Sequence, residues 1–305
     1  SNSVSGSGSA GLVVAAMKAA QPLSKDNYDL SIIILNRNGE DILKELFESF
    51  IMFNTSNAEF IIIDHASTDE SLSMIQDFSS KLPIKVKALG YNDSFSASCN
   101  LGASMATSDT LLFLNNDIIW VQDILPQMLQ SLEDDSVGFV GLKLIKKDAG
   151  WISEVQHLGV RFTLVANEYF PYEVMPTSTE VQNEYSPTIL PAITGAVMLC
   201  RKSDFDKIGG FDSNYFYGFE DVEICIRMKN LLGKSSLCRN DLVALHKHGY
   251  TRLSGREKSV LNKQEHNTKV LFETLGLWLK QKAREALFMG DREWSLHTLN
   301  IAFVV

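Results

Sequence analysis

Short apolar runs alternate with amphipathic segments over the first third of the chain, and this alternation limits the fold more than any other feature. The expected strands are Leu30–Leu35, Phe60–Ile63, Ile84–Ala88 and Thr110–Leu114, and most of them are apolar runs. The segments between them, at 40–53, 71–78 and 96–106, have helical spacing or small residues. Strands that are apolar on both faces need cover on both sides, as in a parallel sheet with crossover helices. The sequence therefore predicts a doubly wound α/β sheet with four parallel strands.

The pattern changes from about Val137 onward, where strand-like pieces follow one another without clear helices between them. This predicts a smaller mixed or antiparallel region. Residues 165–187 are polar and contain proline, so we expect a long loop there. Residues 220–232 and most of 257–288 have helical spacing.

These shifts predict three segments. Residues 1–27 are interpreted as a cloning remnant and flexible leader, because they are rich in serine and glycine. The main domain is expected at 28–255, with halves at 28–136 and 137–255. A helical extension is expected at 256–305.

Charge and cysteine content exclude several functions. The chain has 28 Lys and Arg against 37 Asp and Glu, a net charge of −9 that argues against bulk capture of nucleic acid or anionic lipid. The four cysteines form no CxxC pair, which indicates reduced thiols in a cytoplasmic protein. No GxGxxG follows the first apolar run, so the dinucleotide-binding fingerprint is missing. The absence of a GxxxxGK[ST] loop argues against P-loop phosphoryl transfer, and the absence of a GxSxG elbow argues against an α/β-hydrolase.

Polar residues follow three of the four expected strands. These clusters are Asn36-Arg37-Asn38, Asp64 to Asp69 and Asn115-Asn116-Asp117. Each alone could be ordinary turn chemistry, but parallel strands bring their carboxyl ends to one sheet edge, where ligands bind. Without a Gly-rich phosphate loop, a nucleotide there would need a divalent cation, and the Asp117 carboxylate suits Mg²⁺ or Mn²⁺.

A second group of residues lies beyond position 190. Thr194 and Gly195 open one apolar stretch, and a run of aromatic residues leads into Glu220 and Asp221 at an expected helix start. Aromatic rings beside carboxylates suit sugar binding, and such an acid can serve as a general base. The same acids could instead only complement the helix dipole.

Two histidines form the third element. His246 and His248 are two positions apart on an expected strand, so they share one face and either could reach the site as a metal ligand.

Five segments together resemble the inverting nucleotide-sugar glycosyltransferases of family 2, which have the GT-A fold, and in particular the rhamnosyltransferase-like branch. They are SIIILNRNGEDILKELFESF, DHASTDES, FSASCNLGASMATSDTLLFLNND, ITGAVMLCRKSDFDKIGGFDSNYFYGFEDVEICIRM and ALHKHGYTR. The match runs from about Leu30 to Thr251.

The resemblance implies a role for each matching position. Leu35, Asn36, Arg37, Asp64, Asn100 and Asn116 would bind the nucleotide, and Thr194 and Gly195 would line the donor-sugar and acceptor region. Asp117 and His246 would hold Mn²⁺ or Mg²⁺, with His248 in reserve. Asp221 would be the catalytic base, supported by Glu220. The chain departs from the family pattern at Asn115, Arg37 and His65, where Asp, Tyr and Asn are usual.

The implied activity is transfer of a sugar from a UDP- or dTDP-sugar to a hydroxyl of a glycan or lipid-linked glycan. The resemblance suggests a bacterial enzyme of cell-envelope polysaccharide assembly, in the cytoplasm or at the inner face of the cytoplasmic membrane. It leaves room for peripheral membrane association and for a homodimer. Two alternatives stay open: a non-catalytic glycan- or nucleotide-binding module of the same fold, and a sugar-1-phosphate nucleotidyltransferase, for which NRNGED is a poor phosphate loop.

Overall fold

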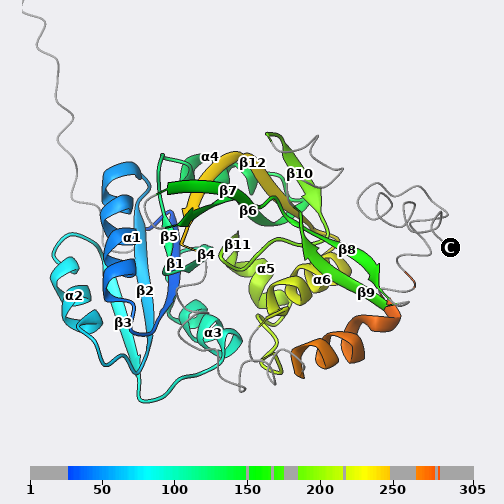
Figure 1. Cartoon of the computed structure of the whole chain (residues 1–305), viewed down its shortest axis with the longest axis horizontal. Helices are drawn as coiled ribbons and strands as arrows, with labels where there is room; N and C mark the ends of the chain where they lie inside the picture. The colour runs from blue at the N-terminus through cyan, green and yellow to red at the C-terminus, as the bar shows by residue number, and fades with distance from the viewer. Residues whose placement is uncertain are drawn as a thin grey trace, which may run out of the picture.

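The first half of the protein is a parallel sheet (Figure 1). The computed structural model describes residues 27–148, 151–165, 168–174, 185–215, 218–247, 266–278 and 281. Four strands in the order β3-β2-β1-β4 form this half: β1 (Leu30–Asn36), β2 (Ala58–His65), β3 (Ile84–Leu89) and β4 (Thr110–Asn115). The crossover helices are α1 (Glu40–Phe53), α2 (Ser71–Phe78) and α3 (Phe95–Met105). The predicted parallel sheet and its three helices are confirmed, with ends that shift by one or two residues.

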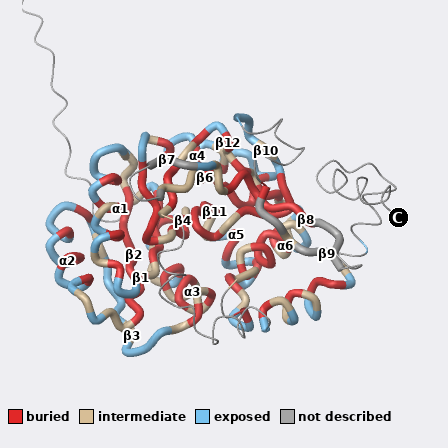
Figure 2. The backbone as a smooth tube through the Cα atoms, viewed as in Figure 1, coloured by how far each residue is buried: buried red, intermediate tan, exposed pale blue. Residues whose placement is uncertain are grey.

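Strands β1, β2 and β4 are buried on both faces, as apolar strands require, whereas the edge strand β3 is largely exposed (Figure 2). Along β1, Ile32 and Ile34 pack in one core cluster with α1 and α2, whereas Ile33 packs in another with α3. The strand order reverses between β1 and β4, which places the switch point of the sheet between these two strands. The carboxyl ends of β1, β2 and β4 therefore form the edge where a ligand is expected.

The second half extends the same sheet with mixed pairing, as predicted. Its strands are β5 (Ile118–Ile119), β6 (Val137–Asp148), β7 (Trp151–His157), β10 (Pro187–Leu190), β11 (Val197–Arg201) and β12 (Ser235–His246). Strand β11 lies antiparallel between β4 and β6, and β12 runs parallel to β6. This pairing joins the two halves into one sheet.

The long loop predicted for residues 165–187 is wrong in part. Strand β9 (Glu168–Glu173) lies within it and pairs antiparallel with β8 (Val160–Val165) in a separate two-stranded sheet. Pro171 stands opposite Phe162 in this pair. An edge strand tolerates proline, because an edge position needs no ladder N–H.

Helices of the second half cover both faces of the sheet. They are α4 (Leu125–Ser131), α5 (Lys202–Lys207), α6 (Glu220–Leu232) and a helix at 266–278. The predicted helix at 220–232 is confirmed. Leu271 and Leu275 of the helix at 266–278 are buried in the same core cluster as α6. Predictions for 1–26, 248–265, 279–280 and 282–305 fall outside the described residues, and the predicted domain boundaries stay predictions. Among the described helices, none has the length and apolarity to cross a bilayer.

Glycine at position 102 allows α3 to lie close against β1. A Cβ placed on Gly102 would come within 2.4 Å of the Ile33 Cγ2 atom. We expect Gly102→Ala to lower the free energy of unfolding by about 1–3 kcal/mol, because overpacking forces the backbone apart. Gly90→Ala is the matched control, since nothing lies within 4 Å of its Cβ position. Urea unfolding measures both, and equal stabilities would contradict the close-packing argument.

A buried carboxylate ties the amino ends of the strands together. Glu59 accepts hydrogen bonds from the Ser31 hydroxyl at 2.5 Å and the Thr107 amide at 2.7 Å, and its other oxygen lies 2.8 Å from Lys85 Nζ. Burial opposes ionisation of Glu59, but the contacts with Lys85, Ser31 and Thr107 outweigh it and lower the pKa of the carboxyl below its ordinary value.

This network predicts a pH-dependent stability. Because the folded pKa lies below the unfolded value of about 4.5, the contribution of Glu59 is complete above that pH. It disappears as the pH falls through the lower folded pKa. We expect Glu59→Gln to cost about 1–3 kcal/mol at pH 7, with a smaller gap from the wild type near pH 3. Urea unfolding at both pH values measures this, and a pH-independent gap would refute it.

Candidate functional site

Three amide and carboxylate side chains meet at the switch point between β1, β2 and β4. The Asn36 Nδ2 atom donates to Asp64 Oδ1 at 3.1 Å, and Asn116 Nδ2 donates to Asn36 Oδ1 at 3.1 Å. All three side chains are buried. The strand ends thus bring Asn36, Asp64 and Asn116 together, as the parallel register predicts.

The loops after β1 and β2 are held together beside this chain of side chains. The Ser67 hydroxyl donates to Asp64 Oδ1 at 2.6 Å and accepts from the Asn38 amide at 2.9 Å, while Thr68 N–H donates to Asn38 Oδ1 at 2.7 Å. Asn38 and Ala66 both have positive φ, at 48° and 52°. Reciprocal bonds hold these left-handed residues and so shape the rim around Asp64.

Glycine is required at position 39 because of the Asn36–Asn116 contact. A Cβ there would lie 2.5 Å from Asn36 Oδ1 and 2.6 Å from Asn116 Nδ2. The neighbouring predicted residues differ in exposure: Leu35 is half-buried and Arg37 is exposed. Neither Gly39 nor Ser67 received a role from the sequence, although Ser67 belongs to the quoted DHASTDES element.

Two further polar residues support the loop after β2. His65 Nδ1 lies 2.9 Å from Asn92 Oδ1 and its Nε2 lies 2.8 Å from Ser98 Oγ, so both ring nitrogens are used within the protein. Asp69 accepts from the amides of Glu40 and Ser71, at the starts of α1 and α2. Burial opposes ionisation of Asp69, but these hydrogen bonds lower its pKa.

Asp117 and His246 form the pair predicted as metal ligands. Strand β5 pairs with the end of β12, which brings Asp117 Oδ1 to 3.1 Å from His246 Nε2, and the Lys247 amide donates to the Asp117 carbonyl. Both side chains are buried, and Asp117 Oδ1 has no hydrogen-bond partner in the described residues. A buried carboxylate oxygen with no such partner beside an imidazole nitrogen fits a divalent cation. In the described part of the chain no third His, Cys, Asp or Glu joins them.

The orientation of the His246 ring is set by a residue that the sequence did not indicate. His246 Nδ1 lies 3.0 Å from Gln156 Oε1 on β7, which leaves Nε2 toward Asp117. A partner on the second ring nitrogen is typical of metal-binding histidines. No motif contains Gln156, so only the β6–β7 pairing reveals it. The reserve ligand His248 lies outside the described residues.

Asp221 lies in the first turn of α6 and contacts the segment that opens β11. Its Oδ2 accepts the Gly195 amide at 2.8 Å and its Oδ1 accepts the Val222 amide at 2.9 Å. A Cβ on Gly195 would lie 3.3 Å from Asp221 Cβ and 3.4 Å from Phe95 Cζ, so a small residue is needed there. Thr194 is half-buried beside it, and its hydroxyl accepts the Ala196 amide at 3.3 Å.

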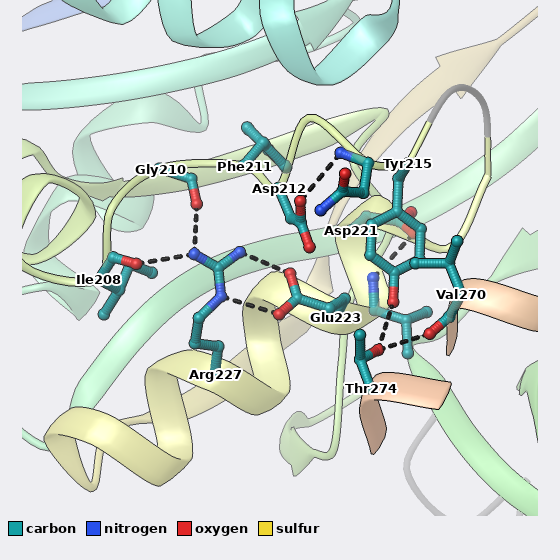
Figure 3. A network of polar contacts seen from close by, with 12 residues as sticks. Ile208, Gly210, Phe211, Asp212, Tyr215, Asp221, Glu223, Arg227, Val270 and Thr274 are labelled. Atoms are coloured by element: carbon teal, nitrogen blue, oxygen red, sulfur yellow. Dashed lines mark hydrogen bonds and ion pairs between the residues drawn. The ribbon is translucent and has the colours of Figure 1, made fainter. Parts of the chain in front are cut away.

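The other acids of α6 differ from Asp221 in their surroundings. Glu220 is buried at the helix start. Glu223 forms a two-pronged ion pair with Arg227, whose third nitrogen donates to the carbonyls of Ile208 and Gly210 at 2.7 Å each (Figure 3). The Arg227 guanidinium is therefore paired with Glu223 and hydrogen-bonded to the turn at residues 208–210. Glu223 thus has a structural role.

Asn100 clamps the same turn from the side of α3. Its Nδ2 donates to the Phe211 carbonyl and its Oδ1 accepts the Phe211 amide, both at 2.8 Å. Both ends of the Asn100 amide are engaged with the backbone, and its predicted nucleotide role stays a prediction.

The four cysteines are free and buried, as the sequence suggested. Burial raises the pKa of the Cys225 thiol to about 12. A thiol with that pKa is a poor nucleophile, so cysteine chemistry is not part of this site.

The end of β4 connects the residue groups described above. The Asn115 amide donates to the Ala196 carbonyl at 2.9 Å, next to the Gly195 that binds Asp221. Asp117 follows two residues after Asn115. The Asn36–Asp64–Asn116 cluster, the Asp117–His246 pair and Asp221 thus lie around the carboxyl end of β4.

Two protein-family models match most of the chain. The model described as glycosyl transferase family 2 matches residues 31–209, and one described as the N-terminal domain of galactosyltransferase matches 178–250.

Curated relatives agree with this assignment. Rhamnosyltransferase WbbL of Escherichia coli is 29% identical over 205 residues, which cover 65% of this chain and 75% of that protein. The O-antigen biosynthesis protein RfbC of Myxococcus xanthus is 26% identical over 230 residues, 73% of this chain but only 18% of that protein.

Solved structures share the fold. GalNAc-T7, solved with UDP, GalNAc and Mn²⁺, gives a TM-score of 0.58 at 18% identity, covering 73% of this chain and 44% of that one. A mannosyltransferase of Pyrobaculum calidifontis, in complex with GDP-Man and Mn²⁺, gives 0.54 at 14% identity, covering 90% and 85%. The GT-A fold that the family resemblance implied is confirmed.

Proposed function

The chain belongs to glycosyltransferase family 2, and from that premise we propose that it transfers a sugar from a UDP- or dTDP-sugar to an acceptor hydroxyl with inversion. The observation that carries the proposal is the placement of Asp221. Its carboxylate is fixed against the Gly195 amide beside the end of β4, where the nucleotide-side residues meet. Rhamnosyltransferase WbbL and the O-antigen protein RfbC support a polysaccharide or lipid-linked glycan acceptor.

In this proposal the buried edge of the sheet binds the donor nucleotide. Asp64 and Asn36 present hydrogen-bonding groups beside Leu35 and Arg37, in a place where no Gly-rich loop cradles phosphate. The reciprocal bonds between the two loops fix this rim before the donor arrives, which reduces the ordering cost of binding.

Asp117 and His246 would hold Mn²⁺ or Mg²⁺, because they offer one carboxylate oxygen and one imidazole nitrogen 3.1 Å apart in a buried place. Such a cation supplies positive charge for the donor diphosphate. The solved neighbours with Mn²⁺ and a nucleotide or nucleotide-sugar support this assignment.

Asp221 acts as the general base. Its carboxylate takes the proton of the acceptor hydroxyl while the hydroxyl oxygen forms a bond to the anomeric carbon of the donor. The bond from that carbon to the diphosphate breaks on the opposite side, the nucleoside diphosphate keeps the electron pair, and the configuration inverts. The amides of Gly195 and Val222 orient the carboxylate without a countercharge of their own.

Removal of the Asp221 charge tests this role. We expect Asp221→Asn to lower kcat about 100- to 10,000-fold, the usual contribution of a general base. Asparagine keeps an oxygen that can accept the Gly195 amide, so nucleotide affinity and stability should be unchanged. The matched control is Asp206→Asn, an exposed carboxylate on α5 that pairs with Lys202. Full activity of a folded Asp221→Asn protein would exclude Asp221 as the base.

Calorimetric titration with UDP, dTDP and GDP, each with and without Mn²⁺, tests the donor side. We expect UDP or dTDP to bind more tightly with Mn²⁺, and Asp117→Ala to abolish that gain because it removes the only carboxylate of the described pair. Asp77→Asn, an exposed acid on α2, is the control. A folded protein that binds no nucleotide would refute the donor site, and binding without turnover on any acceptor would favour a non-catalytic module.

A further inference from the structure

The turn that leads into α6 has a backbone conformation that needs support. Gly218 and Phe219 have φ values of 101° and 67°, so two successive residues are left-handed. The second is not glycine, and for such a residue this conformation costs roughly 1–2 kcal/mol. A conformation of this kind persists only where neighbouring groups hold it.

The helix at 266–278 provides that support. The Asn267 Nδ2 atom donates to the Gly218 carbonyl at 2.9 Å, and Asn267 is fully buried. The same helix also contacts Tyr215, which lies before the turn: the Tyr215 hydroxyl is 3.1 Å from the hydroxyl of Thr274 on the helix at 266–278 (Figure 3). Burial of Leu271 and Leu275 fixes the helix on the core.

A short series of bonds connects Asn267 to Asp221. Gly218 precedes Phe219, whose carbonyl accepts the Glu223 amide at 2.9 Å in the first turn of α6. Asp221 stands within that turn and reaches the Gly195 amide. A shift of the Gly218 carbonyl would therefore rotate the first turn of α6 and move the Asp221 carboxylate.

We propose that Asn267 is a positioning residue for the reaction: it fixes the Gly218–Phe219 turn and thereby aims the Asp221 carboxylate. The inference rests on the proposed function, in which Asp221 is the base. Arg227 and Asn100 hold the far end of the same turn region, at residues 208–211. Asn267 holds the end that lies three residues from Asp221, where Phe219, a residue other than glycine, has a positive φ.

The test replaces Asn267 by leucine, which keeps its size and removes the amide donor. Hydrogen–deuterium exchange reports the position of the base without any assay of activity, because the Gly195 amide donates to Asp221 Oδ2. In Asn267→Leu we expect exchange at Gly195 and in the first turn of α6 to quicken about tenfold, as for loss of one hydrogen bond. Unchanged exchange would overturn the proposal.

Kinetics give the second readout. With a donor that the wild type accepts, we expect kcat to fall about tenfold while the donor KM and nucleotide affinity change less than twofold, since a misplaced base affects turnover and not donor binding. Glu59→Gln, at the amino ends of the strands, serves as a control for general destabilisation far from the turn, and Leu277→Ala for changes on an exposed part of the helix. An equal fall of kcat in these controls, or an unchanged kcat in Asn267→Leu, would refute positioning.

Two arrangements keep the outcome decisive. If Asn267→Leu does not fold, Asn267→Ala removes the same N–H donor with a smaller side chain, and the same results are expected of it. If the wild type turns over no donor, the proposed function fails, and the exchange data alone decide whether Asn267 fixes the turn.

Discussion

The antiparallel pairing of β11 with β4 is the contact on which the candidate site depends. It is a backbone ladder that includes the bond from the Asn115 amide to the Ala196 carbonyl. On one side of this bond the chain continues to Asp117, and on the other it leads back to Gly195, which holds Asp221. The distance between the proposed cation site and the proposed base is therefore set by backbone bonds in the interior of the sheet, where strands move least.

The carboxylates of the protein differ in what they contact. Glu223 is paired with Arg227, and Glu59 with Lys85 and several donors, so these acids hold the fold together. Asp117 faces an imidazole nitrogen, and Asp221 accepts from backbone amides of Gly195 and Val222. In the proposal, the Gly195 and Val222 amides hold the Asp221 carboxylate in place for taking up and releasing a proton. The difference is produced by position on one helix: Glu223 and Arg227 are one turn apart, whereas Asp221 points toward β11.

Most of the first half was predictable from the sequence because buried parallel strands and crossover helices leave strong periodic signals. Leu30–Asn36 and Glu40–Phe53 are examples, and the polar residues at the strand ends follow from the topology alone. Strand β9 was missed because Pro171 and polar neighbours favour a loop, and only the pairing with β8 supplies its partner. Gln156 and Asn267 were missed for a different reason. Each acts through one long-range hydrogen bond, to His246 and to the Gly218 carbonyl, and no local pattern encodes such a contact.

These long-range bonds show how a site with short motifs obtains its precision. The turn before α6 is held by Asn100 from α3, by Arg227 from α6 itself and by Asn267 from the helix at 266–278. These three elements thus contact a region in which four of the described residues have positive φ: Gly209, Gly210, Gly218 and Phe219. The family motifs contain the proposed reacting groups, but a motif fixes only the identity and order of residues. In the proposal, the geometry of Asp221 depends on the buried Asn267 side chain, which lies outside the motif that contains Asp221. The helix at 266–278 then serves the same site, although it lies beyond the predicted main domain.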